Sequence, residues 1–325
     1  MMKRILSLLL ALLCLLALTA CGGKIEPVDD RVVLTLGGEK IYYDYYRYVF
    51  LNTKLDMDGG DATFWENNPE AEAELTDSVM ENLLHYVAIR RLADDYDIAL
   101  TKEQKQSIED TLAQAKAYYS DEESYLESME EAFMTEYAAY YMQEQTLLWQ
   151  LLYDHVTGEL NGIIKADDET VYADIPLNFR RIRYVFIEKK ADNAAEAAET
   201  AETVLAAANS GSDFDALIRE YGDDPDMLRL ISDGYYYTLG AIDEDVQKAV
   251  EGIAEGEIAP LVEVSYGYYV VQRLPLKNEY VEKNFENFRT QYRARIFSEM
   301  LKAEAAAMEK KTTELFEELT VKTMK

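Results

Sequence analysis

Residues 263–273 read EVSYGYYVVQR, and this stretch decides how the middle of the chain folds. It joins two apolar runs, 258–264 and 268–274, across a short break at residues 265–267. β-Branched and aromatic residues are enriched in strands, and a short glycine-containing break between two such runs is typical of a hairpin. The stretch therefore predicts an antiparallel β-hairpin.

The residues upstream of the hairpin alternate between strand and helix patterns. FRRIRYVFI at 179–187 is rich in strand formers, whereas 195–211, 212–222 and 243–257 carry apolar residues at helical spacing. The stretch GDDPDMLRLISDGYYYT at 222–238 is interrupted by proline and glycine, so we expect a loop there. The order β-α-α-loop-α-β-β predicts an α+β module.

Helical patterns surround this module on both sides. After a short strand pattern at Val32–Leu36 and a glycine turn, helical spacing dominates to about residue 165 and resumes beyond Pro275. The C-terminal helix has an apolar face that it cannot bury alone, so we expect it to dock on the N-terminal helices. We therefore predict a mainly helical domain at 32–177, an inserted mixed module at 178–276 and a long C-terminal helix at 277–325 that completes the helical domain.

Two features of the helical part could be mistaken for functional sites. Tyrosines crowd the stretch YYDYYRYVFLNTKL at 42–55, but an aromatic stripe at helical spacing is more often core, and we interpret it as core. The only two histidines, His85 and His155, lie in helical patterns and are interpreted as structural.

Composition excludes several classes of function. The chain has 325 residues, and 62 acidic against 32 basic residues give a formal net charge of −30. A surface of this charge repels nucleic acid, and no basic stripe in the sequence offsets it. The only cysteines, Cys14 and Cys21, lie at the N-terminus, so the rest of the chain has no disulfide, thiolate metal site or cysteine nucleophile. No cofactor and no metal is predicted.

The N-terminus predicts export and lipidation. Lys3 and Arg4 precede an unbroken apolar run, and the run ends in Leu18-Thr19-Ala20-Cys21, which resembles the bacterial lipobox. We therefore predict a lipoprotein signal peptide at 1–20, a lipid on Cys21 and a lipid-anchored linker at 21–31, in which residues 22–30 form a short flexible spacer. These place the protein on the extracytoplasmic face of the cell membrane. The alternative is an ordinary signal peptide, or a membrane anchor with a chance cysteine.

Taken in order, these segments resemble the parvulin-type (PpiC-like) peptidyl-prolyl isomerases in their secreted multidomain form, which includes PrsA-like foldase lipoproteins and SurA-like chaperones. The resemblance lies in VVLTLGGEKIYYDYY at 32–46, in the helix pair of 74–104, and in RRIRYVFI, GSDFDALIREYGDD and EGEIAPLVEVSYGYYVVQR of the mixed module. It implies an antiparallel four-stranded sheet flanked by helices, inserted into a SurA-like helical domain. It also implies action on X–Pro segments of unfolded or folding exported proteins.

The same resemblance implies which residues form the site. Active parvulins usually carry one histidine in the first strand and another in the last, and here both places hold tyrosine, Tyr184 and Tyr269. Asp224 falls near the family's Asp/Cys position, and Ile242 and Val246 fall near the apolar residues that hold the substrate proline. Catalysis is thus expected from Tyr184, Asp224 and Tyr269, with substrate binding by Ile242 and Val246.

The chemistry of X–Pro isomerisation leaves more than one function open. Rotation crosses a barrier of about 18–20 kcal/mol but breaks no bond, so it needs no nucleophile or cofactor. A tyrosine hydroxyl both donates and accepts, so the pair Tyr184–Tyr269, with Asp224 as an acceptor, could replace the histidine network. Two tyrosines also pack well on adjacent strands, so the second hypothesis is a non-catalytic holdase chaperone with a degenerate isomerase domain. A scaffold or solute-binding lipoprotein is the third, and a homodimer is left open.

Overall fold

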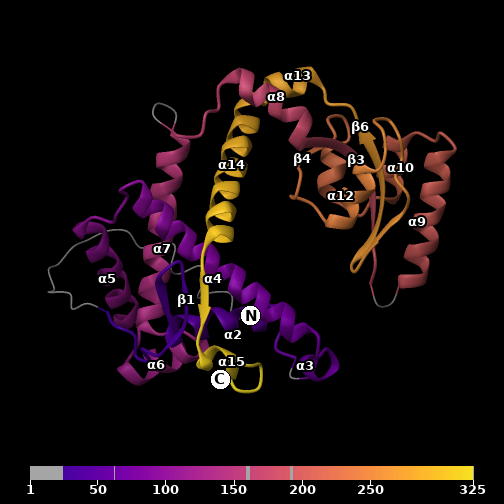
Figure 1. The fold of residues 1–325 in the computed structure, drawn as a ribbon. Helices are drawn as coiled ribbons and strands as arrows, with labels where there is room; N and C mark the ends of the chain where they lie inside the picture. The colour runs from indigo at the N-terminus through magenta and orange to yellow at the C-terminus, as the bar shows by residue number, and fades with distance from the viewer. Residues whose placement is uncertain (1–24, 62, 159–161, 191–192, 325) are drawn as a thin grey trace. The chain divides into compact units, whose positions relative to one another are not determined.

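The computed structural model describes residues 25–61, 63–158, 162–190 and 193–324. The chain divides into two compact units: residues 1–163 with 296–325, and residues 164–295. We call them the helical unit and the sheet unit, and their elements are labelled in Figure 1. The predicted signal peptide and Cys21 lie outside the described residues. In the described part of the chain, no helix is long and apolar enough to cross a membrane.

A small sheet lies in the helical unit. It consists of β1 (Val32–Leu36), β2 (Glu39–Tyr42) and β7 (Lys310–Thr312), in the order β2-β1-β7 with antiparallel neighbours. Gly37 has a φ of +56°, which glycine adopts without the strain that a side chain would add, and it starts the turn between β1 and β2. The prediction of an uninterrupted helix to the C-terminus was wrong, because residues 310–312 pair with β1.

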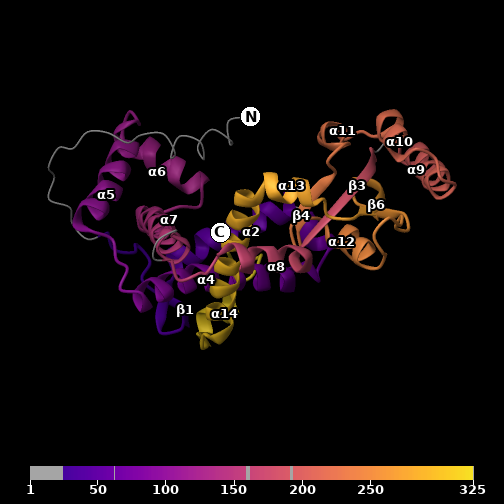
Figure 2. The same cartoon turned by 90° about the horizontal axis from the view of Figure 1, so that it is seen from above.

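Long helices form the rest of this unit. Tyr45 and Tyr46 of the predicted aromatic stripe are each 1% exposed, and the Tyr45 ring centroid lies 4.3 Å from that of Tyr141. The interpretation of the stripe as core is therefore confirmed. Figure 2 shows these helices from above. The helices are α2 (Tyr43–Asp58), α3 (Phe64–Asn67), α4 (Ala71–Asp95), α5 (Lys102–Ala117), α6 (Glu122–Glu131), α7 (Glu136–Thr157), α14 (Phe285–Ala307) and α15 (Glu314–Glu318).

The docking of the C-terminal helix on the helical unit is confirmed. α14 begins in the sheet unit and ends in the helical unit. Within the helical unit, the ring centroid of Phe297 lies 5.8 Å from that of Trp149 and 5.3 Å from that of Tyr153, both on α7. Phe297 is buried by this contact, which supplies the apolar partner that its helix needs.

The described part of the predicted linker is attached to the helical unit. The buried Asp44 carboxylate, in the first turn of α2, accepts hydrogen bonds from the backbone N–H groups of Val28 at 2.7 Å and Asp29 at 3.2 Å. A flexible spacer up to Asp30 was expected. The structure corrects this: the chain is fixed at residues 28–29, because the carboxylate satisfies their backbone donors.

The sheet unit contains the four-stranded antiparallel sheet that was predicted. Its strands are β3 (Phe179–Glu188), β4 (Tyr235–Thr238), β5 (Val262–Val264) and β6 (Gly267–Leu274), in the order β4-β3-β6-β5. β5 and β6 are the hairpin expected from the opening stretch. The fold class, α+β with a mixed module in a mainly helical chain, is confirmed.

The prediction of a loop at 222–238 was wrong. Residues Pro225–Leu230 form helix α11, which contacts α10 and β3, and residues 235–238 form β4. Asp224 caps α11 and Pro225 fits its first turn, because proline has no N–H that would need a partner there. β4 forms because its tyrosines pair with the first residues of β3.

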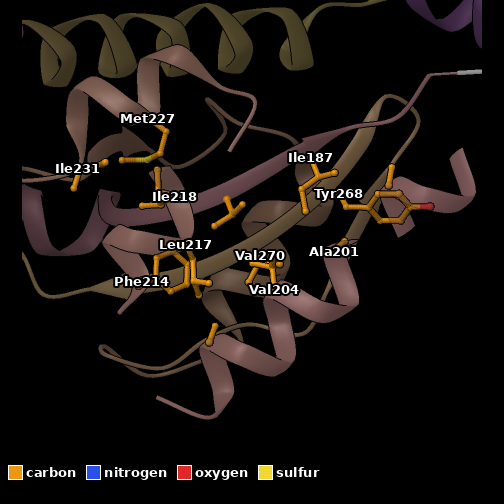
Figure 3. Packing of buried hydrophobic residues seen from close by; sticks show 13 residues of the cluster. Ile187, Ala201, Val204, Phe214, Leu217, Ile218, Met227, Ile231, Tyr268 and Val270 are labelled. Atoms are coloured by element: carbon orange, nitrogen blue, oxygen red, sulfur yellow. The ribbon is translucent and has the colours of Figure 1, made fainter. Parts of the chain in front are cut away.

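Helices cover both faces of this sheet. α9 (Ala194–Asn209) and α10 (Phe214–Tyr221) lie on one face, and α12 (Glu244–Glu251) lies on the other (Figure 1). Ile187 of β3 and Val270 of β6 point towards α9 and α10, where they meet Val204 and Leu217 (Figure 3). Val185 of β3 belongs to the same cluster. α12 ends at Glu251 with Gly252 as its C-cap, earlier than the sequence pattern predicted.

The sheet unit is wider than the predicted module at 178–276. α8 (Asp168–Asn178), α13 (Asn278–Lys283) and the start of α14 belong to it. They bury Phe179, whose ring centroid lies 4.9 Å from that of Phe288. The apolar residues before and after the module need this shared burial, so the unit begins at residue 164 and ends at residue 295.

Candidate functional site

The sheet brings Tyr184 and Tyr269 together on one face. Side chains alternate along a strand, so Tyr184 and Phe186 point away from the face that α9 and α10 cover. In the register of β3 and β6, Phe186 lies opposite Tyr269 and Tyr184 lies opposite Val271. Tyr184 and Tyr269 are therefore diagonal neighbours, with ring centroids 5.3 Å apart at an interplanar angle of 67°.

Asp224 joins this pair from the start of α11. Its Oδ1 accepts a hydrogen bond from the backbone N–H of Asp226 at 2.8 Å, which caps the helix. Its Oδ2 accepts a hydrogen bond from the hydroxyl of Tyr184 at 2.5 Å. The carboxylate is thus held from two sides. The three residues that the sequence nominated for catalysis lie within one small region of the sheet unit.

Both phenols stay protonated at neutral pH. Burial, together with the hydrogen bond to Asp224, raises the pKa of Tyr184 far above its ordinary value. Burial also raises the pKa of Tyr269, and the hydroxyl of Tyr266 and the charges of Asp224 and Asp243 add to the effect. The site therefore supplies neutral hydroxyl groups that donate and accept hydrogen bonds, and it has no phenolate base.

An aromatic wall beside the pair was not predicted from the sequence. The ring centroid of Phe186 lies 4.7 Å from that of Tyr269, and Tyr266 lies next to both, at 5.8 Å from Phe186 and 6.5 Å from Tyr269. Tyr266 is 48% exposed, so the wall reaches solvent. The period-two spacing of residues 184 and 186 was the signal that could have placed Phe186 on this face.

Gly267 makes the contact between the strands possible. A Cβ atom at this position would lie 2.4 Å from Cε2 of Phe186 and 2.5 Å from the carbonyl oxygen of Ile187. No side chain fits at that distance, so the Phe186 ring can lie over the end of β6 only because residue 267 is glycine.

A hollow of about 280 Å³ opens beside Tyr184. Tyr184 and Asp224 share its lining with Tyr235, Leu230 and an Asp226–Arg229 ion pair. Tyr269 does not line it. Within the described residues, no three His, Cys, Asp or Glu side chains gather in a way that would hold a metal ion.

The two residues proposed to bind substrate proline differ in accessibility. Val246 is 3% exposed and packs in the core between α12 and the sheet, whereas Ile242 is half-buried at the edge of the same cluster. Tyr184 and Tyr269 pack against that cluster too. Ile242 is therefore partly exposed to solvent, whereas Val246 is not.

Comparisons with known proteins agree with this geometry. Residues 182–274 match the rotamase family, described as the PPIC-type PPIase domain. Over 280 residues the chain is 25% identical to the foldase protein PrsA of Caldanaerobacter subterraneus subsp. tengcongensis, covering 83% of this chain and 82% of that protein. The prediction of a parvulin-type, PrsA-like foldase is confirmed, as is the peptidyl-prolyl isomerase class of the domain.

Solved structures were also compared with the chain. The crystal structure of PrsA from Bacillus subtilis is 18% identical and covers 86% of this chain and 91% of its own, with a TM-score of 0.28. A SurA-like chaperone structure from Campylobacter jejuni, reported for PEB4 and Cj1289, is 10% identical and covers 87% of this chain and 99% of its own, with a TM-score of 0.34.

Proposed function

Because the chain is a PrsA-like protein-folding factor with a parvulin-type peptidyl-prolyl isomerase domain, we propose that it accelerates cis–trans isomerisation of X–Pro bonds in exported polypeptides. We propose further that it works on the extracytoplasmic face of the cell membrane, attached through a lipid on Cys21. The observation that carries the catalytic part is the Tyr184–Asp224 hydrogen bond beside Tyr269. Neutral phenols stand where active parvulins hold histidines.

The proposed mechanism is selective binding of the twisted amide. Isomerisation must cross about 18–20 kcal/mol, and it speeds up when the site binds the rotated X–Pro bond better than the planar one. Hydroxyl groups fixed beside the rotating carbonyl act as preorganised dipoles. Tyr269 lies at the open side with the exposed Tyr266, so we assign it contact with the substrate. Asp224 orients Tyr184.

The prolyl ring needs an apolar surface next to these hydroxyls. Ile242 is half-buried at the edge of the cluster that also holds Tyr184 and Tyr269, and we assign it contact with the ring. Val246 lies in the core beneath and supports that surface. Ile242 is thus assigned contact with the prolyl ring, and Val246 is assigned support of the surface that the ring contacts.

Exchange spectroscopy on a short Ala-X-Pro-Ala peptide tests the catalytic proposal directly. We expect the wild-type protein to raise the exchange rate above the uncatalysed rate, and Tyr269→Phe to lower kcat/KM about tenfold to a hundredfold by removing one donor near the amide. Glu196→Gln, a change on an exposed residue of α9 on the opposite face, is the control and should keep the wild-type rate. A wild-type rate equal to background would overturn the catalytic proposal.

One observation favours the second candidate, a holdase chaperone without turnover. Val246, which by the family resemblance falls near a proline-binding position, is 3% exposed and is therefore closed off by core packing. A holdase would suppress aggregation of an unfolded client in proportion to its concentration while leaving the X–Pro exchange rate at background. Measuring both quantities on one preparation decides between the two functions.

Anchoring and assembly have their own tests. A Cys21→Ser variant should lose lipid labelling and leave the membrane fraction, whereas retention in that fraction would contradict a lipid anchor. The homodimer remains a prediction. Light scattering of the purified protein gives its molar mass in solution, which distinguishes one copy from two.

A further inference from the structure

Two carboxylates near the aromatic wall, those of Asp224 and Asp243, cap helices. Asp224 accepts hydrogen bonds from the Tyr184 hydroxyl and a backbone N–H, and Asp243 accepts the backbone N–H groups of Asp245 at 3.0 Å and Val246 at 3.4 Å as the cap of α12. Within the described residues, no Lys or Arg forms an ion pair with either carboxylate.

Both carboxylates lie close to Tyr269. Asp243 caps α12 between Ile242 and Val246, which share a cluster with Tyr269. Asp224 is bonded to Tyr184, whose ring centroid lies 5.3 Å from that of Tyr269. In the neighbouring hollow, Asp226 pairs with Arg229, which leaves Asp224 as the excess negative charge of that lining. Two carboxylates without a described ion-pair partner therefore lie near Tyr269.

The aromatic wall is suited to a cation as well as to apolar groups. Phe186, Tyr266 and Tyr269 present three rings whose centroids lie between 4.7 and 6.5 Å apart, and the Tyr266–Tyr269 pair stands at 89°. An ammonium or guanidinium group over an aromatic face is attracted by the negative face of the ring. In the described part of the chain, no cation lies over these three rings.

The nearby cations are already engaged. Lys189, close to the start of the wall in sequence, pairs with Glu263 at 2.7 Å, and Arg229, which lines the hollow with Asp224, pairs with Asp226. An acidic residue next to the substrate proline would thus meet uncompensated carboxylates without a free cation among the described residues to receive it. A cationic residue would be attracted both by the two carboxylates and by the aromatic wall.

We propose that this site prefers X–Pro segments that carry a lysine or arginine adjacent to the proline. The cationic side chain lies against Tyr266 and Tyr269 with its charge directed to Asp243 and Asp224. This preference rests on the proposed isomerase function and adds a substrate class to it. The overall formal charge of −30 attracts the same segments from a distance at low salt.

The test compares three peptides, Ala-Lys-Pro-Ala, Ala-Ala-Pro-Ala and Ala-Glu-Pro-Ala, with the full-length protein. Exchange spectroscopy gives kcat/KM for each, and chemical shifts of the peptide give its dissociation constant independently of turnover. At low salt we expect kcat/KM for the Lys-Pro peptide to exceed that for the Ala-Pro peptide about threefold and that for the Glu-Pro peptide about tenfold. Both ratios should decrease at 0.5 M salt.

The informative variant is Asp243→Asn. Asparagine keeps the cap of α12 and removes only the charge, so the fold should be kept while the ratio of kcat/KM for Lys-Pro to kcat/KM for Ala-Pro falls about twofold to threefold. Glu196→Gln removes the same charge from α9, which packs on the opposite face, and should leave the advantage intact. It controls for the loss of net charge.

The outcomes separate this inference from the proposed function. Equal constants for the three peptides, or a Lys-Pro advantage that Asp243→Asn leaves untouched, would overturn the charge preference while the isomerase function stands. Tighter binding of Lys-Pro that Asp243→Asn weakens, without any acceleration of exchange, would support the preference and overturn the isomerase function. Faster exchange with Glu-Pro than with Lys-Pro would contradict the preference outright.

Discussion

The hydrogen bond between Tyr184 and Asp224 can be measured as a coupling free energy. Tyr184→Phe removes one hydroxyl and keeps the ring, and Asp224→Asn keeps the cap of α11 while removing the charge. The Oη–Oδ2 distance is 2.5 Å, and a hydrogen bond to a charged group contributes about 1.5–3 kcal/mol. Both side chains are only half-buried, so water offsets part of this, and we expect a coupling of about 1–2 kcal/mol.

The assay must report on the sheet unit alone. Both tryptophans, Trp65 and Trp149, lie in the helical unit, so their fluorescence does not follow the site. Hydrogen exchange of peptides from β3 and β6, measured across a urea series, gives the free energy of opening of the sheet for each single variant and the double variant.

Additivity would refute the proposed bond. If the effects of Tyr184→Phe and Asp224→Asn sum to that of the double variant within about 0.5 kcal/mol, the two groups do not interact. The control cycle pairs Tyr184→Phe with Glu196→Gln, which removes a distant charge on α9 and should give additive values.

Three further predictions concern the same unit. Burial and the bond to Asp224 raise the pKa of Tyr184, whereas an unfolded tyrosine titrates near 10, so above pH 10 only the unfolded chain loses this proton and the free energy of unfolding falls as pH rises, by up to about 1.4 kcal/mol per pH unit. Hydrogen exchange between pH 9 and 11.5 should show a shallower fall for Tyr184→Phe, and equal slopes would contradict it. Gly267→Ala should destabilise the sheet by about 1–3 kcal/mol because its Cβ meets Phe186, while Gly252→Ala, with its nearest contact at 3.5 Å, should cost less; equal losses in urea would exclude the clash. Val246→Ala should cost about 2 kcal/mol by leaving a cavity in the core, and a loss below about 0.5 kcal/mol would mean that the side chain is not buried as described.

Local patterns predicted the parts of the fold whose side chains alternate or repeat. The hairpin of β5 and β6 and the strand β3 were visible because their apolar residues follow strand spacing and a glycine separates the hairpin strands. β4 was missed because its three consecutive tyrosines do not alternate and follow a proline and a glycine. β7 was missed because its three exposed residues carry no apolar pattern, and pairing with the distant β1 creates the strand.

The site was predictable to the extent that the family resemblance fixed positions. The resemblance predicted Tyr184, Asp224 and Tyr269 as catalytic residues, and the fold brings these three side chains together. It could not show that Val246 is buried or that Tyr266 extends the aromatic wall into solvent, because both depend on how α12 and the hairpin turn pack against the sheet. It also could not show that Asp224 and Asp243 lie near the ring of Tyr269, because these residues cap two separate helices, α11 and α12.

The exchange rate of an X–Pro peptide in the presence of the full-length wild-type protein tests the central claim most directly. If neutral phenols replace the histidines of this isomerase class, the rate rises with protein concentration above the uncatalysed rate, and Tyr269→Phe lowers the slope. A rate that stays at the uncatalysed value at every protein concentration, with the sheet unit intact by hydrogen exchange, would contradict the claim.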